Sequence, residues 1–153
     1  MLAMIVRPPV TDPEFAAYYA LRYAVLRRPW GEPNGSELDE FEDTAFHLTA
    51  IEDDTVVGVG RLHPISPTEG QIRYMAVHED FSGRGVGTQI LNGLEAGGRE
   101  RGFTSIMLNA REHAVGFYAR NGYETMGEGP LLWDEIRHKV MRKQLAATEA
   151  PHG

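Results

Sequence analysis

The first third of the chain changes from a helical to a strand-like spacing of its apolar positions. After a short apolar segment at residues 5–6, apolar and aromatic side chains recur every three or four residues, as on one face of a helix. Thr11 and Glu14 have the spacing of a capping box, and Pro29 disfavours continuation of the helix. The pattern predicts a strand, then a helix, then a loop over residues 29–44. The core-facing positions of the helix are Phe15, Tyr18, Tyr19, Arg22, Val25 and Leu26.

The middle of the chain has the composition of short strands. Three segments, at residues 45–52, 56–62 and 71–78, are rich in apolar side chains and are separated by turn residues such as Asp53-Asp54. Strands joined by short turns usually pair with each other in the antiparallel sense. We therefore predict an antiparallel meander.

The second half begins with a glycine-rich segment that opens a second amphipathic helix, which ends near Gly102. The remaining predicted elements are a strand at residues 105–108, a helix at residues 114–120, and strands at residues 123–127 and 136–143. This mixture predicts one α/β domain over residues 1–145, followed by a flexible tail at residues 146–153.

The composition is that of a globular protein. The 153 residues fit one domain, and 42% are hydrophobic and 24% charged. The absence of cysteine excludes disulfides, thiolate zinc sites and a cysteine nucleophile. No apolar run approaches the roughly 20 residues that a membrane helix needs, and no secretory signal begins the chain. We expect a cytoplasmic protein with no membrane partner.

The charge distribution limits the partners. A net charge of −7 disfavours binding to nucleic acid and is compatible with a cationic substrate, although acidic proteins are often acidic for solubility alone. Six scattered histidines lack the two-histidine spacing of a helical metal site, so we predict no metal. The acidic residues cluster at Glu37, Asp39, Glu40, Glu42 and Asp43.

A glycine loop lies between the last strand of the predicted meander and the second helix. It reads Phe81-Ser-Gly-Arg-Gly-Val-Gly-Thr88. Its glycines permit positive φ and uncover backbone N–H groups, and the helix that follows adds a partial positive charge, so the loop is either a phosphate cradle or a tight turn. The Walker pattern is absent, and the glycine spacing is not that of a Rossmann loop.

Taken together, three motifs resemble those of the GNAT acetyltransferase superfamily. They are Tyr74-Met-Ala-Val77, the glycine loop, and Ala114-Val-Gly-Phe-Tyr-Ala-Arg-Asn-Gly-Tyr123. The resemblance implies a mixed central sheet that splays between strands four and five and is flanked by helices. It also implies an enzyme that transfers the acetyl group of acetyl-CoA to an amine by direct attack in a ternary complex.

The same resemblance assigns roles to particular residues. The Met75 amide would donate to the oxyanion, and Tyr118 would act as general acid, since a phenol pKa near 10 is close to that of a thiol near 8.5. Residues implied to bind acetyl-CoA are Met75, Ala76, Val77, Ser82, Gly83, Arg84, Gly85, Val86, Gly87, Thr88, Asn109, Arg111, Phe117 and Tyr118.

The sequence departs from the family's pattern at three places. Ser82 replaces the first glutamine or arginine of the loop, and Arg111 stands where an asparagine is usual, which makes Asn109 the substitute. Gln71 occupies a position that often carries a glutamate base. A histidine has a suitable pKa near 6.5, so His47 is our first choice of base, with His63 and Glu69 as alternatives acting through water.

Two other readings remain at this point. The glutamine at position 71 also fits a non-catalytic acyl-CoA-binding or regulatory module, whereas a nucleotide-binding oxidoreductase is disfavoured by the glycine spacing. The resemblance does not specify the acceptor, which would be a small-molecule or peptide amine; the acidic cluster slightly favours a small cation. Many relatives form dimers, so a homodimer is an expectation of the resemblance.

Overall fold

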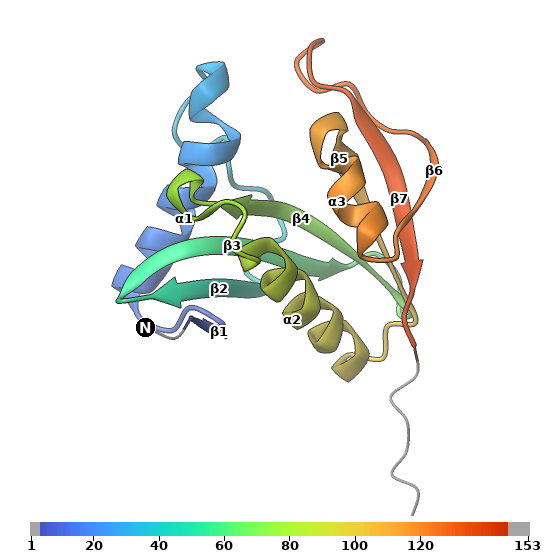
Figure 1. Cartoon of the computed structure of the whole chain (residues 1–153), viewed down its shortest axis with the longest axis horizontal. Coiled ribbons are helices and arrows are strands. Elements are labelled where there is room, and N and C mark those ends of the chain that lie inside the picture. The colour runs from blue at the N-terminus through green and yellow to red at the C-terminus, as the bar shows by residue number, and fades with distance from the viewer. Residues whose placement is uncertain (1–3, 147–153) are drawn as a thin grey trace, which may run out of the picture. The chain divides into compact units, whose positions relative to one another are not determined.

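The computed structural model describes residues 4–146, which form two compact units (Figure 1). Among the described residues, the first unit contains residues 4–63 and 72–97, and the second contains residues 64–71 and 98–146. Strand β4 (Glu69–Val77) contributes residues to both. That the chain is a single domain stays a prediction, and the predicted tail, apart from Ala146, lies outside the described residues.

The strand order is β1-β2-β3-β4-β5-β7-β6 in one seven-stranded sheet. In the first unit, β1 (Ile5–Arg7) pairs antiparallel with β2 (Phe46–Glu52), which pairs antiparallel with β3 (Thr55–Pro64). In the second unit, β7 (His138–Gln144) pairs antiparallel with β5 (Ser105–Arg111) and with β6 (Glu124–Glu128). The predicted class, an α/β fold with a mixed sheet flanked by helices, is confirmed, and β4 neighbours β5, where the splay was predicted.

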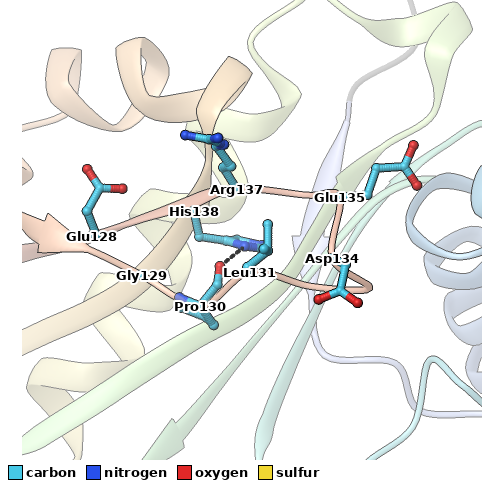
Figure 2. Close-up of a pocket in the computed structure, with 8 residues that line it drawn as sticks. All are labelled: Glu128, Gly129, Pro130, Leu131, Asp134, Glu135, Arg137 and His138. Atoms are coloured by element: carbon cyan, nitrogen blue, oxygen red, sulfur yellow. Dashed lines mark hydrogen bonds between the residues drawn. The ribbon is translucent and has the colours of Figure 1, made fainter.

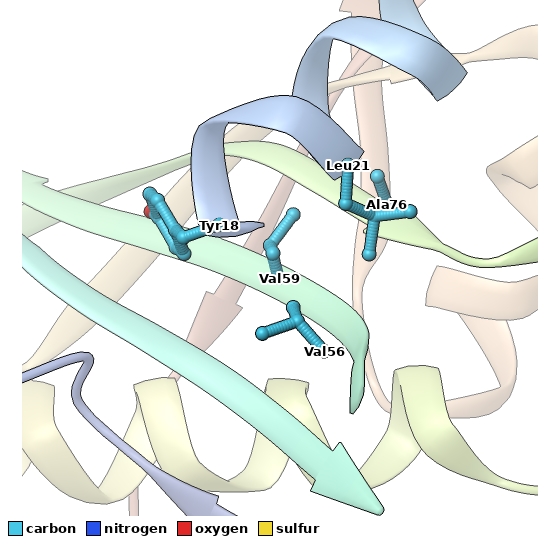
Figure 3. Close-up of a cluster of buried hydrophobic side chains, with 5 residues drawn as sticks. All are labelled: Tyr18, Leu21, Val56, Val59 and Ala76. Atoms are coloured by element: carbon cyan, nitrogen blue, oxygen red, sulfur yellow. The ribbon is translucent and has the colours of Figure 1, made fainter. Parts of the chain in front are cut away.

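Helix α1 (Asp12–Leu26) covers one face of the first unit's strands. It begins as predicted, because the Thr11 hydroxyl accepts a hydrogen bond from the Glu14 N–H. Figure 3 shows how its side chains meet the sheet: Tyr18 and Leu21 lie with Val59 and Ala76 in one buried cluster. The loop after α1 contains a short 3₁₀ helix, η1 (Arg28–Trp30).

Helix α2 (Val86–Glu100) also packs on these strands, and glycines allow it to come close. A Cβ added to Gly58 would lie 2.6 Å from a Val86 methyl, and one added to Gly60 would lie 2.7 Å from an Ile90 methyl. Real Cβ atoms do not approach carbon so closely, so β3 needs glycine where α2 lies against it. This contact sets the position of the glycine loop, because α2 begins within that segment, at Val86.

The second unit holds two short helices after β5, namely η3 (Glu112–Ala114) and α3 (Val115–Arg120). The start of β4 is fixed in this unit because Glu69 accepts hydrogen bonds from the Ser105 hydroxyl and from Arg142. Across residues 4–146, no helix is long and apolar enough to cross a membrane.

Candidate functional site

The residues that the sequence analysis selected lie in both units. The first unit contains His47, Met75–Val77 and the glycine loop, and the second contains Asn109, Arg111, Phe117 and Tyr118. Each group is described here within its own unit.

The glycine loop connects a short 3₁₀ helix, η2 (Glu79–Phe81), to α2. Gly83 and Gly85 have φ of 75° and 79°, and a Cβ built on either one meets nothing within 4 Å. The first bond of the α2 ladder runs from the Gln89 N–H to the Gly85 carbonyl, so the N–H groups of residues 86–88 precede that bond and are free of the helix's own carbonyls. The loop therefore combines open space with the positive end of a helix, as an anion requires.

Strand β4 contains a strained residue directly before Met75. Tyr74 is buried and has φ of 60°, in the left-handed region that residues with a side chain avoid. Such a conformation costs about 1–3 kcal/mol and persists only when the surroundings hold it. A left-handed residue within a strand interrupts the regular ladder and reorients the following peptide bond, whose N–H belongs to Met75.

Four guanidinium groups surround the Tyr74 ring. The central guanidinium carbons of Arg22 and Arg73 lie 4.2 and 4.5 Å from the ring centroid. Those of Arg61 and Arg27 lie at 4.9 and 5.6 Å. A cation over an aromatic face gains about 0.5–2 kcal/mol, most when it is desolvated, so the group as a whole can offset the strain at Tyr74.

Two of these arginines, Arg22 and Arg61, are fully buried and are neutralised by carboxylates of the loop after α1. Glu42 accepts hydrogen bonds from both, at 2.9 Å in each case. The Asp39 carboxylate accepts hydrogen bonds from both terminal nitrogens of Arg61, at 2.6 and 2.9 Å. It also forms an ion pair with Arg73 at 3.0 Å. Burial alone would raise the pKa of Asp39, but the hydrogen bonds from Arg61 and from the Phe41 N–H outweigh it and lower the pKa.

His47 has partners for both ring nitrogens. Its Nε2 lies 2.6 Å from the Glu42 carbonyl, which can only accept, so Nε2 carries the proton. The lone pair on Nδ1 then faces the Tyr18 hydroxyl at 2.8 Å. Burial lowers the pKa of His47, which keeps the ring neutral. A role for His47 as base stays a prediction, and in this geometry its lone pair is already engaged.

The side chains of the two alternative bases, His63 and Glu69, also have hydrogen-bond partners within the protein. His63 stacks on Phe41, with ring centroids 4.5 Å apart, and its Nδ1 accepts from Arg61 at 3.1 Å. Glu69 is engaged by Ser105 and Arg142, as described above. Among the residues that the structure describes, no group of three histidine, aspartate or glutamate side chains is arranged to hold a metal ion.

In the second unit, the predicted residues lie at the end of β5 and on α3. Asn109 and Arg111 are two residues apart and therefore share one face of β5, opposite Val140 and His138 of β7. Tyr118 is buried against Phe117 and Tyr123, with ring centroids 5.0 and 5.8 Å away. Burial raises the pKa of Tyr118, so its phenol is a protonated donor at neutral pH.

Each unit also has a surface pocket with acidic residues. The hairpin between β6 and β7 lines a pocket of about 470 Å³ (Figure 2), in which the ring of His138 points to the Pro130 carbonyl and bonds it at 2.9 Å. The acidic members of this pocket are Glu128, Asp134 and Glu135. In the first unit, a pocket of about 560 Å³ is lined by aromatic rings of α1 and β2 and by Glu42 and Asp43.

A model of the acetyltransferase (GNAT) family matches residues 15–123, which include Tyr74, the glycine loop and Tyr118. The chain belongs to the GNAT family. Among its relatives is the uncharacterised N-acetyltransferase YjcF of Bacillus subtilis (strain 168), which is 30% identical over 127 residues, or 83% of this GNAT chain and 89% of YjcF.

Solved structures give the same assignment. An acyl-CoA N-acyltransferase from Pseudomonas aeruginosa is 26% identical, with a TM-score of 0.75 over 94% of this chain and 99% of that one. An aminoglycoside 6'-N-acetyltransferase complexed with coenzyme A shares the fold at 19% identity, with a TM-score of 0.79 over 95% of this chain and 99% of that one. The GNAT fold and an acyltransferase family are thereby established for this chain.

The sequence analysis missed the buried arginine network, which consists of Arg22 and Arg61 with their carboxylate partners Asp39 and Glu42. Arg22 was interpreted as one of the core-facing positions of its helix, and the acidic cluster as a feature that slightly favours a small cationic acceptor. A signal was present, because Arg61 stands within the apolar segment at residues 56–62, and a buried arginine requires a carboxylate partner.

Proposed function

We propose that this chain transfers the acetyl group of acetyl-CoA to an amine by direct attack in a ternary complex. The observation that carries the proposal is the glycine loop at the start of α2, where a Cβ added to Gly83 or Gly85 would meet nothing within 4 Å and where the helix N-terminus begins. A pyrophosphate fits such a cradle, because it supplies the negative charge that the helix N-terminus favours. Coenzyme A bound to a protein of the same fold supports this reading.

In the proposed reaction the amine nitrogen forms a bond to the acetyl carbon, the carbon–sulfur bond breaks, and the thiolate takes up a proton as the amine loses one. The Met75 N–H, turned by the strained Tyr74, donates to the carbonyl oxygen as negative charge develops there. The phenol of Tyr118 supplies the proton to the thiolate. The amine loses its proton through water, or along the hydrogen bond between Tyr18 and His47.

The remaining parts of the proposed cosubstrate site follow the motifs. Ala76, Val77 and the loop residues from Ser82 to Thr88 are proposed to bind the pantetheine arm and the pyrophosphate. Asn109, Arg111 and Phe117 are proposed as further residues that bind acetyl-CoA. A small cationic acceptor is favoured because both surface pockets present carboxylates, although Glu42 is already neutralised by arginine.

A cytoplasmic location and a homodimer belong to the same proposal. A constant monomer mass in light scattering at increasing protein concentration would reject the dimer.

The direct test is release of free coenzyme A with a panel of amines. The chain has no cysteine, so a thiol reagent detects only the product. The panel pairs small cations, such as polyamines and aminoglycosides, with neutral amines and a peptide amine. We expect thiol release that depends on the amine and is fastest with a small cation. Binding of acetyl-CoA without release on any amine would favour the non-catalytic module instead.

The glycine loop is tested by Gly85→Asp. The substitution adds a side chain at a φ that disfavours one and a carboxylate where a phosphate would lie. We expect the dissociation constant for acetyl-CoA, measured by calorimetry, to rise about 10- to 100-fold, which corresponds to 1.4 kcal/mol for each factor of ten.

Gly102→Asp is the matched control for that measurement. Gly102 follows the other end of the same helix, has φ of 83°, and also has nothing within 4 Å of an added Cβ. It reproduces the backbone strain without placing charge at the loop. Equal loss of affinity in both variants would mean that the glycine loop is only a turn.

A further inference from the structure

We propose that the buried arginine network positions the peptide bond between Tyr74 and Met75, and that it does so by holding the ring of Tyr74. The inference rests on the proposed function, in which the Met75 N–H acts in acyl transfer. Arg22, Arg61, Asp39 and Glu42 are positioning residues in this account, because they reach the reacting atoms only through Tyr74.

The contacts on the ring are the first step of the argument. Arg22 and Arg61 have no exposed side-chain surface, and both guanidinium groups lie within 5 Å of the ring centroid. Among the described residues, neither Nε atom has a hydrogen-bond partner. Each of these buried cations leaves one N–H donor without a hydrogen-bond partner and lies near the aromatic ring, an arrangement that the attraction between cation and ring favours.

The carboxylates fix where those cations lie. Glu42 bonds Arg22 and Arg61 at once, and Asp39 binds Arg61 with two parallel hydrogen bonds. Paired bonds of this kind set the plane of a guanidinium as well as its position. The arginines come from α1 and β3 and the carboxylates from the loop between α1 and β2, so three segments of the chain converge on one side chain of β4.

The backbone shows why the ring needs to be held. Tyrosine has no intrinsic preference for φ of 60°, and without its neighbours Tyr74 would relax to the extended conformation of the strand. Relaxation would turn the next peptide bond and redirect the Met75 N–H. The place of the ring therefore determines the direction of the proposed oxyanion donor.

A network that served stability alone would behave differently. Its loss would lower the melting temperature, but the folded enzyme would keep the direction of the Met75 N–H and its turnover number. Substitutions that keep or remove the aromatic face of residue 74 separate the two roles, because they leave all four network residues in place.

The experiment compares Tyr74→Phe, which keeps the ring, with Tyr74→Leu, which fills similar space without an aromatic face. In protein labelled with ¹⁵N-methionine at most five of the six methionines give amide signals, because Met1 has no amide N–H, and Met75→Leu identifies the Met75 resonance. We expect Tyr74→Phe to keep kcat within about 3-fold and to leave that resonance in place. Tyr74→Leu should shift the resonance and lower kcat by about 10-fold or more, with KM for acetyl-CoA changed by less than about 3-fold.

Arg61→Lys provides a second test should Tyr74→Leu fold poorly. Lysine keeps the positive charge but loses the planar fork that binds Asp39 and lies against the ring. We expect a shifted Met75 resonance and a lower kcat, whereas the control Arg142→Lys, which alters an arginine–glutamate pair of the second unit, should change neither.

An unshifted Met75 resonance in Tyr74→Leu and Arg61→Lys would overturn the proposal, and so would a shifted resonance with unchanged kcat. The methionine spectrum needs no turnover. If wild-type protein transfers no acetyl group to any amine, the proposed function fails, while the spectrum still reports whether the ring holds the peptide bond.

Discussion

Tyr118→Phe is expected to lower kcat about 100-fold while leaving the affinity for acetyl-CoA within a few-fold of wild type. The substitution removes one hydroxyl and keeps the ring that packs against Phe117 and Tyr123. General acid catalysis contributes about 100- to 10,000-fold, and the lower end applies here because burial raises the pKa of the phenol and makes it a weaker acid. Steady-state kinetics with a saturating amine measure the effect.

Tyr123→Phe is the control for this experiment. It deletes a second buried phenol hydroxyl in the same unit and should leave kcat unchanged. A thermal melt of both variants separates a loss of folding from a loss of catalysis. If Tyr118→Phe turns over at the wild-type rate, then Tyr118 is a packing residue and the thiolate is protonated from another source.

The largest expected effect on stability is that of Glu42→Ala. This change leaves Arg22 and Arg61 buried without the carboxylate that they share. Removing one partner of a buried ion pair costs about 3–5 kcal/mol, because the remaining charge is neither solvated nor compensated. For a chain of this length that corresponds to a melting temperature lower by roughly 10 °C, measurable by circular dichroism or calorimetry.

Glu40→Ala is the matched control, since Glu40 is an exposed carboxylate two residues away in the same loop. Exposed substitutions usually change stability by less than about 0.5 kcal/mol. Equal melting temperatures for Glu42→Ala and wild type would mean that the two arginines are not held by Glu42 in solution.

The sequence predicted most elements of the fold because their signals are local. The Thr11 cap, the apolar spacing of α1 and the glycines before α2 all depend on neighbouring residues. The predicted ends of β5 and β7 were less accurate than the predicted elements themselves. The strand predicted to end at Leu108 continues to Arg111, which pairs with His138. Such ends depend on pairing across the sheet, which a single segment does not reveal.

In the candidate site, too, features that depend on neighbouring residues could be predicted, and features that depend on residues far apart in sequence could not. The glycine loop could be predicted because its function needs only backbone N–H groups and positive φ at two glycines. For the arginine network, the sequence signals only that Arg61 needs a carboxylate partner. It does not identify that partner, because the two residues are about 20 positions apart, as in the bond between Arg61 and Asp39. The environment of His47 was missed for the same reason: Tyr18, which engages its lone pair, comes from α1.

The ion pairs between the loop and the sheet have a consequence for engineering new acceptor specificity. Loop exchange between homologous enzymes usually treats a surface loop as a module that can be grafted alone. Here the loop over residues 29–44 carries Asp39 and Glu42, whose counter-charges are Arg22 on α1 and Arg61 on β3. A chimera that received a foreign loop without these carboxylates would bury two uncompensated cations. The transferable unit is therefore the loop together with both arginines, and libraries that vary residues 39 and 42 should vary residues 22 and 61 with them.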